Sequence, residues 1–216
     1  GIACTNLLAA FVIHEYNIEA VNPNKTRIYC LVQDSPFQLG EKVFFATPTV
    51  LSTIKEHYPE VEDYLCLNVA GMSQVTIGEM NYAPITLMSA DASFPRFFPY
   101  QTLAGNLEEA LTEPDKIALT ETTARRFFGK ENPIGRTIYI NHTPEKNTMY
   151  QITAVIREYD QSILSFDGIT AMTPEYGRTS FLLINQSIDP EAFALRLKDD
   201  GVPTFMVDKG RYYLYT

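Results

Sequence analysis

Basic residues are scarce in this sequence relative to acidic ones. Its 216 residues include 17 lysines and arginines against 26 aspartates and glutamates, which gives a formal net charge of −9. The longest basic run is the pair Arg125-Arg126. Nucleic acids and anionic membrane surfaces are bound through basic patches, so the composition argues against both as partners. We expect the acidic excess, and the arginine pair, to lie on a solvated surface.

Cysteine and histidine are also few, with three of each. The cysteines Cys4, Cys30 and Cys66 form no CxxC pair and allow at most one disulfide. Cys30 and Cys66 each lie in an apolar, strand-like run, and we expect both to be buried small hydrophobic residues. The histidines show no HxxxH or HExxH spacing, so the sequence predicts no metal site. They are His14, His57 and His142.

Signatures of covalent or nucleotide chemistry are missing too. GxSxG, HExxH, SxxK and P-loop patterns do not occur. The carboxylates Glu56, Glu60, Glu62 and Asp63 have no base or nucleophile nearby in sequence, and we expect them to form a charged surface. We therefore predict no catalytic residue and no cofactor, and an ATPase motor would have to lie elsewhere.

No apolar run is long enough to cross a bilayer, which takes about 20 residues. The nearest is residues 2–13, IACTNLLAAFVI. This run lacks the basic start and the cleavage site of a signal peptide. Two interpretations remain for it: a helix docked on the core, which composition favours, or the outer end of a transmembrane helix.

The remaining composition is that of a folded globular protein, with 45% apolar and 20% charged residues. Two β-α-β units are predicted near the ends of the chain. The first joins strands at 26–33 and 61–69 through a helix that Thr47-Pro48 opens and Pro59 stops. The second follows a strand at 179–185 with a helix that begins at Asp189-Pro190. Its return strand is 204–207 or 212–215.

The middle of the chain has a different pattern. The expected elements are a hairpin (74–77 and 82–88), a short helix (107–111), a strand (116–119), a capped helix (120–129) and a second hairpin (136–140 and 148–157). Phe94, Phe97, Phe98 and Tyr100 form an aromatic cluster that could contact a cargo, although packing in the core is the expected role.

These elements predict an α+β protein of two lobes. A split, ferredoxin-like β-α-β layer forms one lobe, with helices on one face of its sheet. This lobe is discontinuous and comprises residues 1–95 and 178–216. Residues 96–177 form an inserted, smaller α/β module with a helix, a tight turn and a β-hairpin.

One segment resembles a known family. Residues 117–140, IALTETTARRFFGKENPIGRTIYI, are similar to the signature of the MacB-like periplasmic core domain. In that family a short strand, a capped helix ending in an aromatic-Gly pair, an Asn-Pro-x-Gly turn and a strand follow in this order. Upstream segments at 25–29 and 90–111 agree as well. The motif residues, expected to be structural, are Arg27, Ile28, Tyr29, Asp91, Phe94, Gly105, Phe127, Phe128, Gly129, Asn132, Pro133 and Gly135.

The resemblance covers residues 14 to 216 and implies the periplasmic domain of an FtsX/MacB-type ABC transporter permease, with a porter-type lobe. It implies flanking transmembrane helices in the bacterial inner membrane, a cytoplasmic ATPase domain or subunit, and a second permease copy. ATP-driven movement would push or release cargo outside the membrane. A periplasmic adaptor and a lipoprotein cargo are open as further partners. Residues 2–13 then become the end of a membrane helix.

Two other functions stay open at this point. A free-standing secreted or lipid-anchored binding module would have a signal peptide upstream and no flanking membrane helices. A hydrolase would need a deep pocket with a nucleophile and a base within hydrogen-bonding reach.

The permease interpretation makes a structural prediction of its own. Both chain ends, Gly1 and Thr216, should lie at the same end of the molecule.

Overall fold

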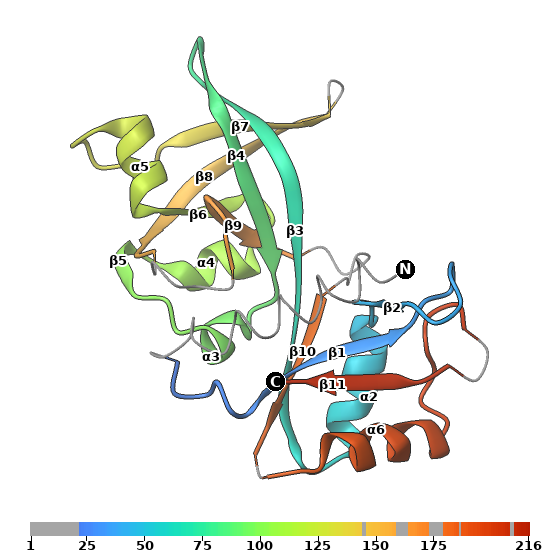
Figure 1. Ribbon diagram of the computed structural model, residues 1–216. Helices are drawn as coiled ribbons and strands as arrows, with labels where there is room; N and C mark the ends of the chain where they lie inside the picture. Colours follow the sequence, from blue (N-terminus) through green and yellow to red (C-terminus); the bar gives the residue numbers. More distant parts are fainter. Residues whose placement is uncertain (1–21, 144–145, 159–163, 173–178, 186, 208–209) are drawn as a thin grey trace. The chain divides into compact units, whose positions relative to one another are not determined.

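The computed structural model describes residues 22–143, 146–158, 164–172, 179–185, 187–207 and 210–216 (Figure 1). The segment 2–13 lies outside these described residues. The chain divides into two compact units. Unit 1 comprises Gly1–Cys66 and Pro174–Thr216, and unit 2 comprises Leu67–Thr173.

Unit 1 is built around β1 (Ile28–Asp34). This strand pairs antiparallel with β10 (Thr179–Ile184) and with β11 (Tyr212–Tyr215). With β3 (Val61–Ile77), the strand order is β11-β1-β10-β3. The two-residue strand β2 (Lys42–Val43) pairs with the end of β1. The return strand is thus 212–215, because 204 and 207 form only an isolated bridge.

Two helices of unit 1 begin where their capping residues predict. In α2 (Pro48–His57) the Thr47 hydroxyl accepts a hydrogen bond from the Val50 amide at 3.3 Å. In α6 (Pro190–Asp199) the Asp189 carboxylate accepts from the amides of Glu191 and Ala192. Side-chain acceptors satisfy amides that the first helical turn leaves without partners, and proline at the first helical position needs none. Both predicted helix starts are confirmed.

Unit 2 contains a closed circle of strands. The pairing runs β3-β4-β9-β6-β8-β7 and returns to β3. The strands are β3 (Val61–Ile77), β4 (Met80–Ala90), β6 (Lys116–Thr120), β7 (Thr137–Thr143), β8 (Lys146–Ile156) and β9 (Gly168–Ala171), with β5 (Thr102–Gly105) added beside β8. The helices α3 (Phe94–Phe97) and α4 (Leu107–Thr112) lie between β4 and β6 along the chain.

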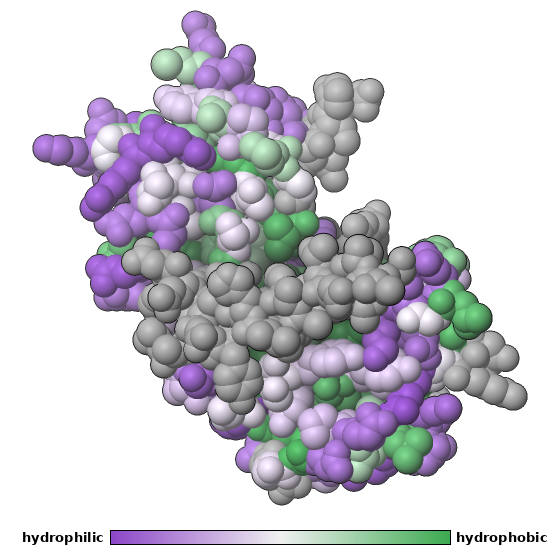
Figure 2. Space-filling view, in the orientation of Figure 1, coloured by the Kyte–Doolittle hydropathy of each residue, from purple (hydrophilic) through white to green (hydrophobic). Residues whose placement is uncertain are grey.

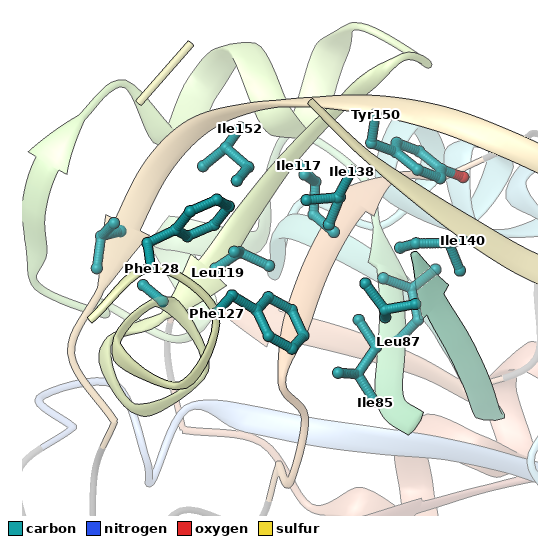
Figure 3. Close-up of a cluster of buried hydrophobic side chains, with 13 residues drawn as sticks. Ile85, Leu87, Ile117, Leu119, Phe127, Phe128, Ile138, Ile140, Tyr150 and Ile152 are labelled. Carbon is teal, nitrogen blue, oxygen red and sulfur yellow. The ribbon is translucent and has the colours of Figure 1, made fainter. Parts of the chain in front are cut away.

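The circle of strands encloses a hydrophobic core that α5 (Glu121–Phe128) completes (Figure 3). Phe127 and Phe128 point from α5 toward the strands, and both are buried. Ile138 and Ile140 of β7 face the same core with no exposed surface, as their alternation predicts.

The first boundary between the units differs from the predicted one. It falls between Cys66 and Leu67 rather than after residue 95. The reason is strand pairing, since the second part of β3 pairs with β4 and β7, and β4 pairs with β9. The β3–β4 hairpin therefore belongs with unit 2.

The strand predictions need correction in two respects. The strands predicted at 61–69 and 74–77 are one strand, β3, which continues through register shifts between Val69 and Met72 and between Ser73 and Val75. β5 and β9 lie outside the predicted strands, because each depends on pairing with strands that are distant in sequence.

The cysteines Cys30 and Cys66 lie on opposite faces of the unit 1 sheet. Cys66 contacts Ser180, which is paired with Leu31, the neighbour of Cys30 on the other face of β1. The two sulfurs therefore cannot join in a disulfide. Cys66 is buried as predicted, whereas Cys30 is only partly buried.

Gly105 ends β5 in a backbone conformation with φ of 75°, and a Cβ there would lie 2.0 Å from the carbonyl oxygen of Thr153. We expect Gly105→Ala to lower the free energy of unfolding by about 3 kcal/mol, measured by urea denaturation. Gly135→Ala is the matched control, because Gly135 has φ of 82° but open space around it. It should cost about 1 to 2 kcal/mol, and equal losses at the two positions would contradict the predicted clash.

Candidate functional site

Arg27 fastens the start of β1 to two other strands of unit 1. Its Nε donates to the carbonyl oxygen of Ile184 at 2.8 Å, and one terminal nitrogen donates to Asn24 Oδ1 at 3.1 Å. The other terminal nitrogen pairs with the carboxylate of Glu62 on β3. In return, the Ile184 amide donates to the Arg27 carbonyl at 2.9 Å. One guanidinium thus links the segment that precedes β1 with two other strands, β10 and β3.

The first and last strands of unit 1 meet at one end of its sheet, where β1 starts and β11 ends. β1 starts at Ile28, and β11 ends at Tyr215, which is paired with Cys30 (Figure 1). Because the two strands are antiparallel neighbours, the start of one lies beside the end of the other. Gly1 lies outside the described residues, so the expectation about both chain ends stays a prediction.

The turn between α2 and β3 is bound to α6 at the edge of the same unit. Arg196 pairs with Glu60 at 2.6 Å, and the Tyr58 hydroxyl donates to Asp200 at 2.8 Å. Burial and the hydrogen bond to Asp200 raise the pKa of Tyr58 to about 12. Burial alone would raise the pKa of Glu60, but the hydrogen bond and charge of Arg196, with a backbone hydrogen bond, lower it overall.

Asp167 joins three elements of unit 2 where the family-like segment begins. Its carboxylate accepts from the Thr86 amide at 2.7 Å and from the Thr123 hydroxyl at 2.9 Å. Its backbone carbonyl accepts from Thr120, the residue that caps α5. The carboxylate therefore holds the start of α5 against β4. The sequence offered no signal for it, because its partners lie 44 and 81 residues away.

The remaining motif residues shape turns. Gly129 ends α5 with φ of 61°, and its amide donates to Arg125. Asn132 accepts from the Ile134 amide at 3.1 Å, and the Gly135 amide donates to Ile152 on β8 at 2.8 Å. Together these bonds turn the chain from α5 into β7. Pro133 lies within this turn, Asp91 accepts from Ser93 ahead of α3, and Phe94, Ile28 and Tyr29 are buried.

The twelve motif residues are thus divided between the units. Arg27, Ile28 and Tyr29 lie in unit 1, and the other nine lie in unit 2. None of them converges on a shared site, and their common structural role stays a prediction.

The predicted aromatic cluster lies in the core. Phe94, Phe97, Phe98 and Tyr100 are buried, and Phe94 stacks on Tyr100 at 5.6 Å between ring centres, as expected for a core cluster.

The four carboxylates near the start of β3 do not form one charged surface. Glu56 is exposed, and Glu60 and Glu62 are paired with arginines. The side chain of Asp63, only 8% exposed, binds Lys55.

The described ranges contain no group of three or more His, Cys, Asp or Glu side chains that could hold a metal ion. Among the same residues, no helix is long and apolar enough to cross a membrane.

The family model described as the MacB-like periplasmic core domain matches residues 11–204. This chain belongs to that family. The match covers both units and includes the Arg27 segment and the α5 turn. The chain is therefore the periplasmic core domain of an ABC transporter permease and is not an enzyme, which confirms both predictions. The α+β fold class is confirmed as well.

Solved structures share the fold. A domain assigned to a permease protein of Porphyromonas gingivalis is 18% identical, with a TM-score of 0.73 over 89% of this chain and 91% of that one. The extracellular domain of the noncanonic ABC-type transporter YknZ from Gram-positive bacteria is 12% identical (TM-score 0.63, 88% and 100% covered). The periplasmic region of MacB from Actinobacillus actinomycetemcomitans is 10% identical (0.60, 87% and 86%). Among curated proteins, none matches this sequence.

Removing the Arg27 guanidinium should loosen unit 1. We expect Arg27→Met to lower the free energy of unfolding by about 1 to 3 kcal/mol, because the Ile184 carbonyl and the Glu62 carboxylate lose a charged donor. Arg125→Met is the control. Its side chain is 73% exposed and pairs only with Glu121 one turn away, so the change should stay within about 0.5 kcal/mol. Urea denaturation measures both, and equal effects would exclude a special role for Arg27.

The lowered pKa of Glu60 predicts an acid-sensitive contribution to stability. A carboxylate whose folded pKa lies below its unfolded value stabilises the fold above the unfolded value, 4.5, and loses this effect as pH falls through the folded pKa. We therefore expect Glu60→Gln to be less stable than the parent by up to about 1 kcal/mol at neutral pH. The difference should shrink below pH 4.5. A difference that does not change with pH, in denaturation from pH 7 to 3, would contradict this.

Proposed function

We propose that this domain transmits movement from flanking membrane helices to a cargo or partner outside the membrane. A cytoplasmic ATPase, on the same chain or a separate one, would generate the movement. In this proposal the domain lies on the periplasmic side of the bacterial inner membrane as part of an integral membrane protein. The observation that carries the proposal is the shared end of β1 and β11 in unit 1.

The position of these two strands suits the transmission of force. Segments that join at the start of β1 and at the end of β11 pull on adjacent, hydrogen-bonded strands rather than on separate loops. Arg27 distributes a load at the start of β1 to β10 and β3 through two side-chain interactions, with Ile184 and Glu62. Leu31 and Val32 of β1 have no exposed surface, so the strand is packed on both faces and resists displacement.

The test uses the full-length permease assembled with its ATPase. A spin label at Glu56→Cys on the exposed side of α2, with the native cysteines changed to serine, reports the distance between the domains of two permease copies. Double electron–electron resonance measures this distance in two states, without nucleotide and after trapping with ATP and vanadate. The two states should give different distance distributions. Identical distributions in the two states would overturn the proposal.

Two controls refine this measurement. A transporter whose ATPase cannot hydrolyse or close on ATP should show no shift, which excludes a direct effect of the nucleotide. Arg27→Met should broaden the distribution or reduce the shift, because the entry to β1 is less firmly held, whereas Arg125→Met should not.

A further inference from the structure

The loop between β1 and β2 presents two large apolar side chains to solvent. Phe37 is 83% exposed and Leu39 is 103% exposed, the two highest values among the exposed large hydrophobic residues of the described chain. Isolated surface hydrophobic residues are common, but two within three positions of one loop are not explained by packing.

This loop is held in shape by its own hydrogen bonds. The Ser35 hydroxyl accepts from the amides of Phe37 and Gln38, each at 3.2 Å. The Ser35 amide donates to the carbonyl of Glu41 at 2.8 Å, and Gly40 takes the positive φ of 82° that closes the turn. The two apolar side chains are therefore displayed by an ordered loop, which lowers the entropy lost when they bind.

A second loop, residues 203–207, displays a third apolar side chain. Met206 is 73% exposed and has φ of 56°, the only positive φ at a non-glycine position in the described residues. The preceding residue, Phe205, is clamped by the buried side chain of Gln33, which donates to its carbonyl at 2.9 Å and accepts from its amide at 2.8 Å. Phe205 also stacks on Phe45 at 4.0 Å. The unfavourable backbone of Met206 is thus imposed by firm neighbours, a pattern that points to function.

The two loops lie at the same end of the unit 1 sheet. Gln33 and Asp34, the last residues of β1, bind Phe205 and the Arg211 amide respectively, and Ser35 follows directly. This end is opposite the one where β1 starts and β11 ends. Figure 2 shows hydrophobic surface in green at this end, where Figure 1 draws the loop after β1. We call Phe37, Leu39 and Met206 the apolar tip.

We propose that the apolar tip is a self-association surface, which packs against the same tip of a second copy of this chain. A two-fold contact of this kind requires only the tip itself and no separate recess. At about 150 Å² for each large side chain, the three residues offer roughly 450 Å² per copy. Two copies would bury about 900 Å², the size of a weak or transient interface.

Charge favours a second copy over a lipid surface. Segments 35–40 and 202–207 contain no charged residue, so two chains of net charge −9 can meet there with little repulsion. Lys42, which follows the loop after β1, is engaged by the ring of Tyr213 and the hydroxyl of Tyr215, whereas Asp208 and Lys209 lie outside the described residues. Asp34 and Glu41 flank the loop and oppose binding to an anionic bilayer. Two copies held in one transporter would supply the high local concentration that a weak contact needs.

Sedimentation equilibrium of this chain tests the proposal without ATP or cargo, so its outcome is independent of the proposed transport role. We expect a monomer–dimer equilibrium with a dissociation constant between about 10 μM and 1 mM. Phe37→Asp and Leu39→Asp should each weaken it at least tenfold, since like charges would meet at the two-fold axis. A monomer at every concentration up to about 1 mM would overturn the proposal.

Matched variants locate the contact. Met80→Asp, 64% exposed in unit 2, and Leu195→Asp, 48% exposed on α6, should leave the dissociation constant unchanged. If either weakens association as much as Phe37→Asp, the apolar tip is not the interface. Met206→Gly keeps a positive φ without strain and should weaken the dimer while the thermal stability stays equal or rises.

A fluorescent variant separates self-association from lipid binding. The sequence contains no tryptophan, so Phe37→Trp introduces a unique reporter. Its emission should move to shorter wavelength as the protein concentration rises. The same shift at a concentration where the chain is monomeric, on adding vesicles of phosphatidylcholine with or without phosphatidylglycerol, would overturn self-association in favour of a lipid surface.

Discussion

The antiparallel pairing of β1 with β10 and β11 is the interaction on which unit 1 depends. It buries Leu31 and Val32 on opposite faces of the sheet and fixes both ends of the strand. Arg27 stands at one end and binds β10 and β3, while Gln33 stands at the other and binds the backbone of Phe205. A buried amide such as that of Gln33 must find partners, and it finds them in a loop 172 residues away. The same strand therefore positions both the end of the sheet where β1 meets β11 and the apolar tip.

Unit 2 obtains its order in another way, through a closed circle of strands filled from one side by α5. The amphipathic spacing of Ala124, Phe127 and Phe128 places one face of this helix in the core. Asp167 then fixes where the helix begins.

Local chemistry explains which parts of this fold could be predicted. Thr47-Pro48, Thr120 and Asp189-Pro190 cap helices through contacts within four residues, so the sequence alone reveals them. The short strands β5 and β9 exist only because distant strands pair with them, and the unit boundary follows β3 through its irregularities. The same limit applies to the site. The family resemblance identifies Arg27 as a structural motif residue. It does not identify the partners of Arg27, because Glu62 and Ile184 lie 35 and 157 residues away.

The closed circle in unit 2 also limits where a foreign strand can pair with the domain and start aggregation. Each of its six strands has a neighbour on both sides, so it offers few unpaired backbone groups to a foreign strand. In unit 1, by contrast, β11 pairs only with β1 among the described residues and ends the row of strands. Strand addition is therefore expected at Tyr212–Tyr215 and at β5, which pairs only with β8 among the described residues, rather than at the six strands of the circle. The open edge of unit 1 thus lies beside the start of β1, because β11 ends where β1 begins.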